Sequence, residues 1–170
     1  MQKYLSLTFV LVVTLLCATI VSAQTAAPSA ADKAATAKVV QLLEGSGHGY
    51  TKAKDGVWVV NFKGNQLSEF AVITIYSEGM LIFVATVAEK ANYKPAPELL
   101  QKLLHLNDTL DRVKIGINDK DGDAFVRIDL SLRVVDQEEF KANLEQISAA
   151  VDETYVVVKP FLLAPKKAVK

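Results

Sequence analysis

Two neighbouring segments, Phe70–Tyr76 and Met80–Val87, are apolar at nearly every position, so neither alternates between an apolar and a polar face. The residues between them, Ser-Glu-Gly at 77–79, are typical of a hairpin turn. Strands that are apolar on both faces usually lie in the middle of a sheet that is covered on both sides. We expect helices of the same chain to cover one face. A second subunit, another layer or a bound partner would cover the other.

The remaining pattern predicts four more strands and three helices. Strands are expected at 50–55, 57–62, 113–118 and 124–133, and Asp121-Gly122 between the last two is a strong hairpin signal. Apolar residues at helical spacing predict helices at about 32–44, from the opening prolines Pro95 and Pro97 to Asn107, and from Asp136 to about Tyr155. The expected fold class is α+β, with a mainly antiparallel sheet and three helices in the order α-β-β-β-β-α-β-β-α.

Cap residues are expected at the ends of these helices. Asp32 would cap the start of the first helix. Asn107 would end the second, because asparagine tolerates the left-handed conformation. Asp136, with Glu139 three residues later, makes a capping-box-like start for the third. The second helix would carry a wide apolar face, formed by Leu99, Leu100, Leu103, Leu104 and Leu106.

The first 23 residues have the features of an export signal. Lys3 precedes an apolar stretch, and Val21-Ser22-Ala23 is a small-residue cleavage site, so we expect cleavage between Ala23 and Gln24. The alternative is an uncleaved membrane anchor, because the stretch approaches the ~18–20 residues of a membrane span. Cys17 is not expected to be a lipoprotein cysteine, because it follows Leu16, where a lipoprotein signal would have a small residue. We expect a periplasmic or secreted protein with a flexible linker at 24–31, one domain at 32–163 and a frayed basic tail at 164–170.

Composition narrows the function classes. Lysine plus arginine equals aspartate plus glutamate, at 19 each, so no single-sign field favours nucleic acid or an anionic membrane. One cysteine can form neither a disulfide framework nor a thiolate zinc site, and two histidines leave little for imidazole chemistry. The metalloprotease, nucleophile-elbow and cysteine-nucleophile motifs do not occur. We therefore expect no cofactor, no metal and no enzyme activity.

Three segments look at first like chemical sites but have plainer interpretations. Placing Gly122 at the sixth position of a calcium loop puts Ile117 at the first ligand position, so a hairpin turn is favoured. The glycine-rich segment Gly45–Gly49 follows a helix and precedes a strand, the reverse of a phosphate-binding loop. His105 could pair with a nearby aspartate as acid and base, but the fringe of an amphipathic helix is its commoner setting.

Two predicted faces could contact a partner. Arg127, Asp129, Ser131 and Arg133 share a polar strand face, for which a solvated sheet face with cross-strand charge pairs is the favoured interpretation. The doubly apolar hairpin is more informative, because a large exposed apolar patch marks an interaction site. The expected partner surface consists of Trp58, Ile73, Ile75, Ile82, Val84 and Phe125.

Several segments together resemble a known family. They are the leucines of 99–106 ending in Asn107, the turn Asp119–Asp123, the strand Val126–Leu130 and the helix start Asp136–Phe140. The chain resembles the YbjN family and, more broadly, the type III secretion chaperone-like fold. The resemblance implies a protein that dimerises and binds extended segments of other proteins, and it brings no catalytic residue. The fourth apolar strand and the export signal depart from the cytosolic secretion chaperones, so a role with a secretion apparatus does not transfer.

We therefore expect an exported, non-enzymatic, chaperone-like binding module that forms a homodimer or binds a protein or peptide client. Nucleic acid is not an expected partner, and a membrane would be contacted only through an uncleaved signal. The alternative is a periplasmic carrier of a small apolar ligand, if the two-sided sheet closes over a pocket. The first hypothesis predicts a sheet face open to other chains, and the second predicts an enclosed cavity.

Overall fold

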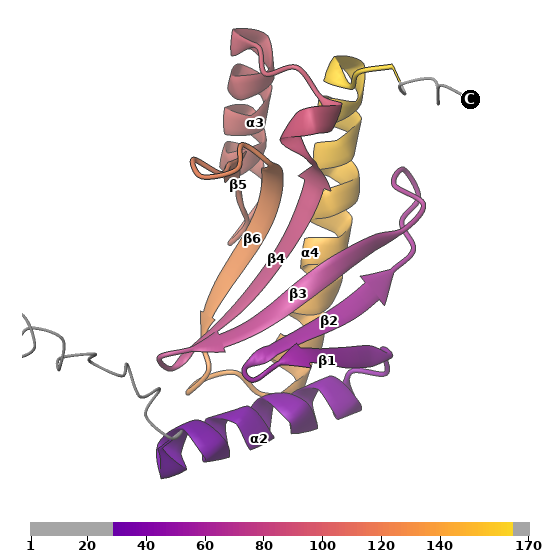
Figure 1. Ribbon diagram of the computed structural model, residues 1–170. Coiled ribbons are helices and arrows are strands. Elements are labelled where there is room, and N and C mark those ends of the chain that lie inside the picture. The colour runs from indigo at the N-terminus through magenta and orange to yellow at the C-terminus, as the bar shows by residue number, and fades with distance from the viewer. Residues whose placement is uncertain (1–28, 165–170) are drawn as a thin grey trace, which may run out of the picture.

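The computed structural model describes residues 29–164, so the expected export signal, its Ala23–Gln24 cleavage site and residues 165–170 of the tail lie outside the described residues. The described chain forms one antiparallel six-stranded sheet in the order β1-β2-β3-β4-β6-β5 (Figure 1). The strands are β1 (Tyr50–Lys54), β2 (Val57–Phe62), β3 (Phe70–Ser77), β4 (Met80–Ala88), β5 (Lys114–Ile117) and β6 (Ala124–Ser131). The helices are α2 (Ala30–Gly45), α3 (Pro97–Thr109) and α4 (Gln137–Val158), with short 3-10 turns η1 (Lys90–Asn92) and η2 (Lys159–Phe161). The expected α+β class and element order are confirmed.

Two helix starts show how local sequence sets the boundaries. The expectation that Asp32 caps α2 is wrong, because Ser29 is the N-cap and its Oγ accepts a hydrogen bond from the N–H of Asp32 at 3.1 Å. Asp32 is instead the N3 residue of a capping box, and its carboxylate accepts in return from the N–H of Ser29 at 3.3 Å. At α4 the expected cap is confirmed, since the Asp136 carboxylate accepts from the N–H of Glu139 at 2.8 Å.

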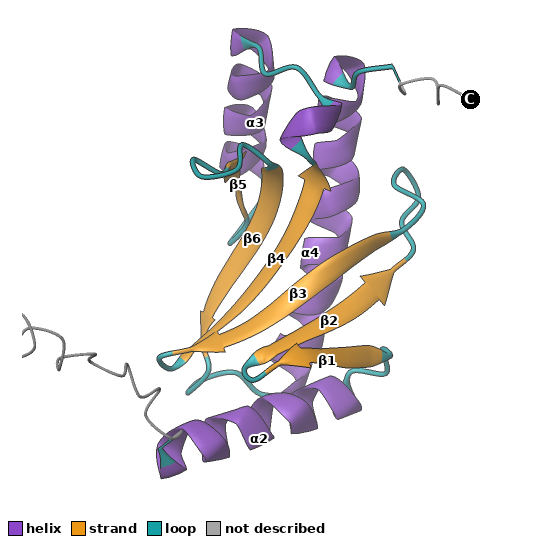
Figure 2. Cartoon of the chain, viewed as in Figure 1, coloured by secondary structure: helices purple, strands orange, loops and turns teal. Residues whose placement is uncertain are grey.

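The helices lie mainly on one side of the sheet. Figure 2 shows α3 and α4 behind it and α2 across its lower end, below β1, while no helix crosses the side turned to the viewer. The contacts agree: α4 packs against β4 and β6, α3 packs against β5 and α4, and α2 touches α4 and β3. The sheet therefore has one helix-covered face and one uncovered face within residues 29–164.

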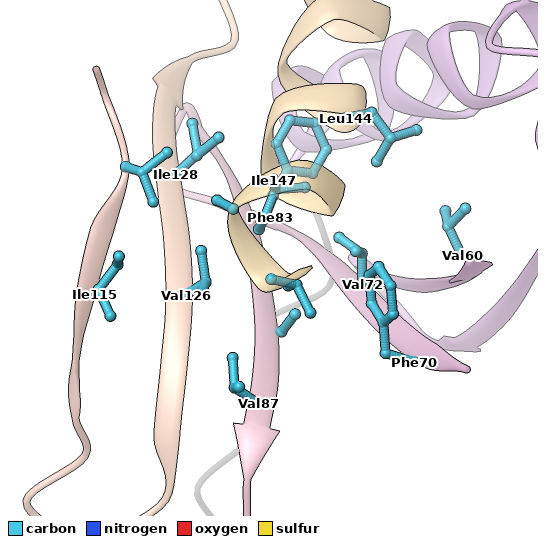
Figure 3. Close-up of a cluster of buried hydrophobic side chains, with 14 of the residues drawn as sticks. Val60, Phe70, Val72, Phe83, Val87, Ile115, Val126, Ile128, Leu144 and Ile147 are labelled. Atoms are coloured by element: carbon cyan, nitrogen blue, oxygen red, sulfur yellow. The ribbon is translucent and has the colours of Figure 1, made fainter. Parts of the chain in front are cut away.

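The core fills the space between the sheet and α4. Phe83 of β4 meets Phe140 of α4 edge-on, with ring centroids 5.3 Å apart, and both side chains are fully buried. Figure 3 shows the surrounding apolar side chains converging from the strands and the helix. Burying a large apolar side chain stabilises a fold by roughly 1.5–3 kcal/mol, so this layer is the main source of stability. It also fixes which strand positions are left to face outward.

Candidate functional site

The uncovered side of the sheet carries a continuous apolar surface, here called the open face. Val59, Ile73 and Val84 lie directly opposite one another on three neighbouring strands, and Val57, Ile75 and Ile82 form a second such row. Directly opposed side chains in antiparallel strands are about 4.5–5.5 Å apart, so each row is in contact. The apolar members of the open face are Val57, Val59, Ala71, Ile73, Ile75, Met80, Ile82, Val84 and Phe125.

The side chains of the open face are sheltered only by one another, and no other element of residues 29–164 lies over them. Ile73 and Met80 are each 37% exposed, although both lie in the strands of an extensive sheet. Ile75, Ile82, Val84 and Phe125 are half-buried. A sheet face of this kind is apolar and unpartnered, which is the usual mark of a contact surface.

Five of the six residues expected at a partner surface come together on the open face, and Trp58 does not. Trp58 is 1% exposed and lies opposite Thr74 on the helix-covered face. Its strand alternates, so it shares a side with the fully buried Val60. The largest ring of this strand is used for packing, and its neighbours Val57 and Val59 face outward instead.

Charged side chains border the open face on β5 and β6. The Nζ of Lys114 and the Nε of Arg127 each donate a hydrogen bond to the Asp129 carboxylate at 2.6 Å. Burial raises the pKa of Asp129, but the two hydrogen bonds and the charges of Lys114 and Arg127 outweigh it and hold the pKa below its ordinary value. Asp129 thus forms one cross-strand ion pair, with Lys114 of β5, and one pair within β6, with Arg127, beside the apolar surface.

Both outer edges of the sheet are protected against pairing with another strand. On β5, the side chain of Asn107 takes up the outward backbone of Ile115: its Nδ2 donates to Ile115 O and its Oδ1 accepts from Ile115 N–H, both at 2.7 Å. On β1, Lys52 and Lys54 are exposed and flank a bulge. Lysines, bulges and side-chain caps are the usual means of blunting an edge strand.

The role of Asn107 differs from the one expected. It does not end the helix, since α3 continues to Thr109 and Asn107 stays helical. Nothing local predicts this, because the bonded partner belongs to a strand eight residues further on. The predicted wide apolar face of α3 is also only partly buried. Leu99 and Leu103 are packed, whereas Leu100 is 50% and Leu104 71% exposed.

A cleft opens between β3 and β4 at one end of the open face. These strands pair only from Ile73–Ser77 to Met80–Val84 and then diverge (Figure 1). On the far side β4 stays paired with β6, and its register shifts between Thr86 and Ala88. The cleft has a volume of about 450 Å³. Its lining comes from both strands and from the segments beyond them: Leu67, Glu69, Phe70, Ala71, Ile73, Thr86, Val87, Ala88, Glu89, Asn92 and Leu162.

The loop at the entrance of this cleft is held by one carboxylate of α4. Asp152 accepts hydrogen bonds from the backbone N–H groups of Asn65 at 2.6 Å and of Gln66 and Leu67 at 3.1 Å. Burial raises the pKa of Asp152, but these three donors outweigh it and lower the pKa. The helical pattern of α4 gives no hint of this role, because it depends on which loop the helix meets.

A second cleft of about 480 Å³ adjoins Thr86 on the other side of β4. It is lined by open-face residues and by the turn between β5 and β6, whose Asp119, Asp121 and Asp123 lie at its rim. The turn is the predicted hairpin: Gly122 has φ +78° and its N–H donates to Asn118 O at 2.7 Å. Among residues 29–164, no group of three His, Cys, Asp or Glu side chains is placed to hold a metal ion.

The two histidines lie apart from these clefts. The ring of His48 lies 4.8 Å from that of Phe62, and His105 is exposed on α3 without a hydrogen bond to Asp108 or Asp111 in the described structure.

Within residues 29–164, no helix combines the length and the apolar character needed to cross a membrane.

The fold and the open face define a class of small α+β proteins, helix-covered on one sheet face and apolar on the other. Residues 36–159 match the family described as "YbjN: Putative bacterial sensory transduction regulator". The chain belongs to the YbjN family. No match was found among curated proteins.

Solved structures share the fold at low sequence identity. The ExsC-ExsE complex gives a TM-score of 0.54 at 14% identity, over 72% of this chain and 95% of that chain. YbjN from E. coli, described as a putative transcription regulator, gives 0.51 at 18% identity, over 74% and 92% of the two chains. The ExoU-SpcU complex from the type III secretion system of Pseudomonas aeruginosa gives 0.51 at 15% identity, over 71% and 97%.

Proposed function

We propose that this chain is an exported, non-enzymatic, chaperone-like module that binds protein through its open face. The observation that carries the proposal is the apolar, uncovered side of the sheet, centred on Ile73, Ile75, Ile82 and Val84. Covering such a surface is favourable at roughly 25 cal/mol per Å² of apolar area removed from water. Packing within residues 29–164 leaves this surface in contact with water. The free energy of burying it would therefore favour binding of a second chain over the open face.

The comparisons support a protein partner. Two of the similar structures are complexes of two proteins, ExsC with ExsE and ExoU with SpcU. The export signal expected at residues 1–23 supports a periplasmic or secreted location. N-terminal sequencing of the protein recovered from the producing cell should begin at Gln24, and a chain that still starts at Met1 in the membrane fraction would contradict cleavage.

The occupant of the open face is either a second copy, giving a homodimer, or a segment of a client. The exposed Leu100 and Leu104 of α3 offer a further apolar surface for self-association. Light scattering coupled to gel filtration, on the chain as the cell processes it, measures the mass of the particle. Fluorescence of bis-ANS measures the apolar surface that remains open.

The test compares an open-face variant with a matched control. Ile73→Ser combined with Ile82→Ser removes the centre of the open face, whereas Val156→Ser removes a 50% exposed valine from α4. We expect the double variant to dissociate a dimer, or to lose more than half of the bis-ANS signal of a monomer, and the control to do neither. Equal effects of both variants would contradict the proposal. A monomer that binds one fluorescent fatty acid, unaffected by the double variant, would favour the carrier alternative.

A further inference from the structure

The divergence of β3 and β4 leaves backbone groups without a strand partner inside the sheet. Continuing their register would pair Val72 with Ala85, Ala71 with Thr86 and Phe70 with Val87, and none of these pairs is formed. Each segment is paired on its other side only, with β2 or with β6. More than about 90% of buried backbone N–H and C=O groups in native proteins are hydrogen-bonded, so two facing unpaired segments are a place for a third strand.

The side chains around the cleft fit a strand that is apolar on one side. The buried apolar side chains that line the cleft are Phe70, Val87 and Ala88, all less than 10% exposed. On the open face the cleft is lined by the small side chains of Ala71 and Thr86 and by Ile73. Successive side chains of a strand point to opposite faces, so every second residue of an inserted segment would meet the apolar layer.

The rim of the cleft is acidic. Five carboxylates and two basic side chains line this cleft and the adjoining one beside Thr86: Glu69, Glu89, Asp119, Asp121 and Asp123 against Lys120 and Arg127. Arg127 is moreover bonded to Asp129. The residues of an inserted segment that face outward therefore gain from being lysine or arginine.

We propose that the cleft between β3 and β4 receives an extended segment of a partner protein, apolar at alternate positions and basic between them, which pairs its backbone with Phe70–Val72 and Ala85–Ala88. This inference rests on the proposed function and specifies how the partner is held. Because β3 and β4 are antiparallel, the segment runs parallel to one and antiparallel to the other. The outer edges are blunted at Asn107 and at Lys52 and Lys54, so the cleft is the favoured place for strand addition.

The first experiment selects a displayed library of random ten-residue peptides on the purified, naturally processed chain. We expect the enriched peptides to alternate apolar and polar residues and to carry excess lysine or arginine. Acidic peptides, or apolar residues at helical spacing, would overturn the inference. If no peptide is enriched over a blank surface, both this inference and client binding by the open face are contradicted.

The second experiment distinguishes pairing of the peptide backbone in the cleft from side-chain contact with the open face. An enriched peptide is remade with N-methyl groups at alternate residues, in both possible phases, which removes backbone donors but keeps the side chains. We expect at least tenfold weaker binding in one phase or both. Unchanged binding in both phases, together with loss of binding to the Ile73→Ser, Ile82→Ser variant, would leave the proposed function intact and overturn strand insertion.

The charge argument has its own control. Glu69→Gln and Glu89→Gln should each weaken the peptide about two- to fivefold, the range expected for exposed charge pairs. Glu44→Gln, an exposed glutamate on α2, should leave binding unchanged. An equal effect of all three substitutions, or no effect of any, would contradict a basic segment in this cleft.

Discussion

Leu81 and Ile82 are isomeric side chains on neighbouring positions of β4, and they test directly whether the open face is uncovered. Leu81 is fully buried against the helices, whereas Ile82 is half-buried on the open face. Replacing either residue with alanine removes three carbon atoms from the same strand. Any difference between the two free energies of unfolding therefore reports mainly what lies over each face.

The structure sets the size of the difference. At ~0.8 kcal/mol per buried CH₂, the three carbons of Leu81 contribute about 2.4 kcal/mol, and the cavity that remains brings the expected cost to about 3–4 kcal/mol. Ile82 loses only part of this transfer energy and leaves no enclosed cavity, so we expect about 1 kcal/mol, including its strand preference. The Leu81→Ala variant should thus be less stable than Ile82→Ala by about 2–3 kcal/mol.

Urea denaturation measures both values with a built-in probe. Trp58 is the only tryptophan of the chain and is 1% exposed, so its fluorescence follows loss of the core. With a slope of roughly 2 kcal/mol per molar urea, the two midpoints should differ by about 1–1.5 M.

Equal costs for the two variants would refute the reasoning, because the open face would then be covered as fully as the core. Repeating the urea titration at a tenfold lower protein concentration then identifies what lies over the open face. A second copy makes the cost of Ile82→Ala depend on protein concentration, and a covering segment of the same chain does not.

Three further predictions concern contacts that hold the ends of the sheet. Asp152→Ala should cost about 1–2 kcal/mol and speed amide exchange at 65–67, because three backbone donors lose their acceptor. Since the folded pKa of Asp152 lies below the ordinary 3.8, its stabilisation is complete above that pH and is lost as the pH falls through the lowered value. Amide protection at 65–67 that does not decline at all as the pH is lowered below 3.8 would contradict this. Asn107→Ala should cost about 1–3 kcal/mol and promote aggregation, measured by light scattering, because the edge at Ile115 is uncapped. Gly64→Ala should loosen the same loop as Asp152→Ala, since its Cβ would lie 2.7 Å from Leu67 O, and an unchanged urea midpoint would refute it.

Much of the architecture follows from local patterns. The two-sided apolar segments predicted a central hairpin, and β3 and β4 do lie between β2 and β6. Boundaries expected from alternation and turn signals agree within a few residues with those of the strands, because strand period and turn chemistry are properties of short segments. The cap of α2 is also a local feature, because Ser29 three residues before Asp32 is the sequence signal of a capping box.

Other features depend on which segments meet. Alternation separated Trp58 and Val60 from Val57 and Val59, but the side that α4 covers decided which pair is buried. The bonds of Asn107 to β5, eight residues further on, and of Asp152 to a loop more than eighty residues earlier each join two different elements. The divergence of β3 from β4 arises where one strand follows β2 and the other follows β6.

By itself, then, the amino-acid sequence determined the elements, their order and the presence of a hairpin that is apolar on both faces, of which one layer of helices can cover only one. Only the tertiary structure decided which apolar positions remain outside, where the sheet splits, and how its edges are closed. The physical reason is that periodicity assigns residues to faces, whereas exposure depends on the packing partner of each face, which lies elsewhere in the chain.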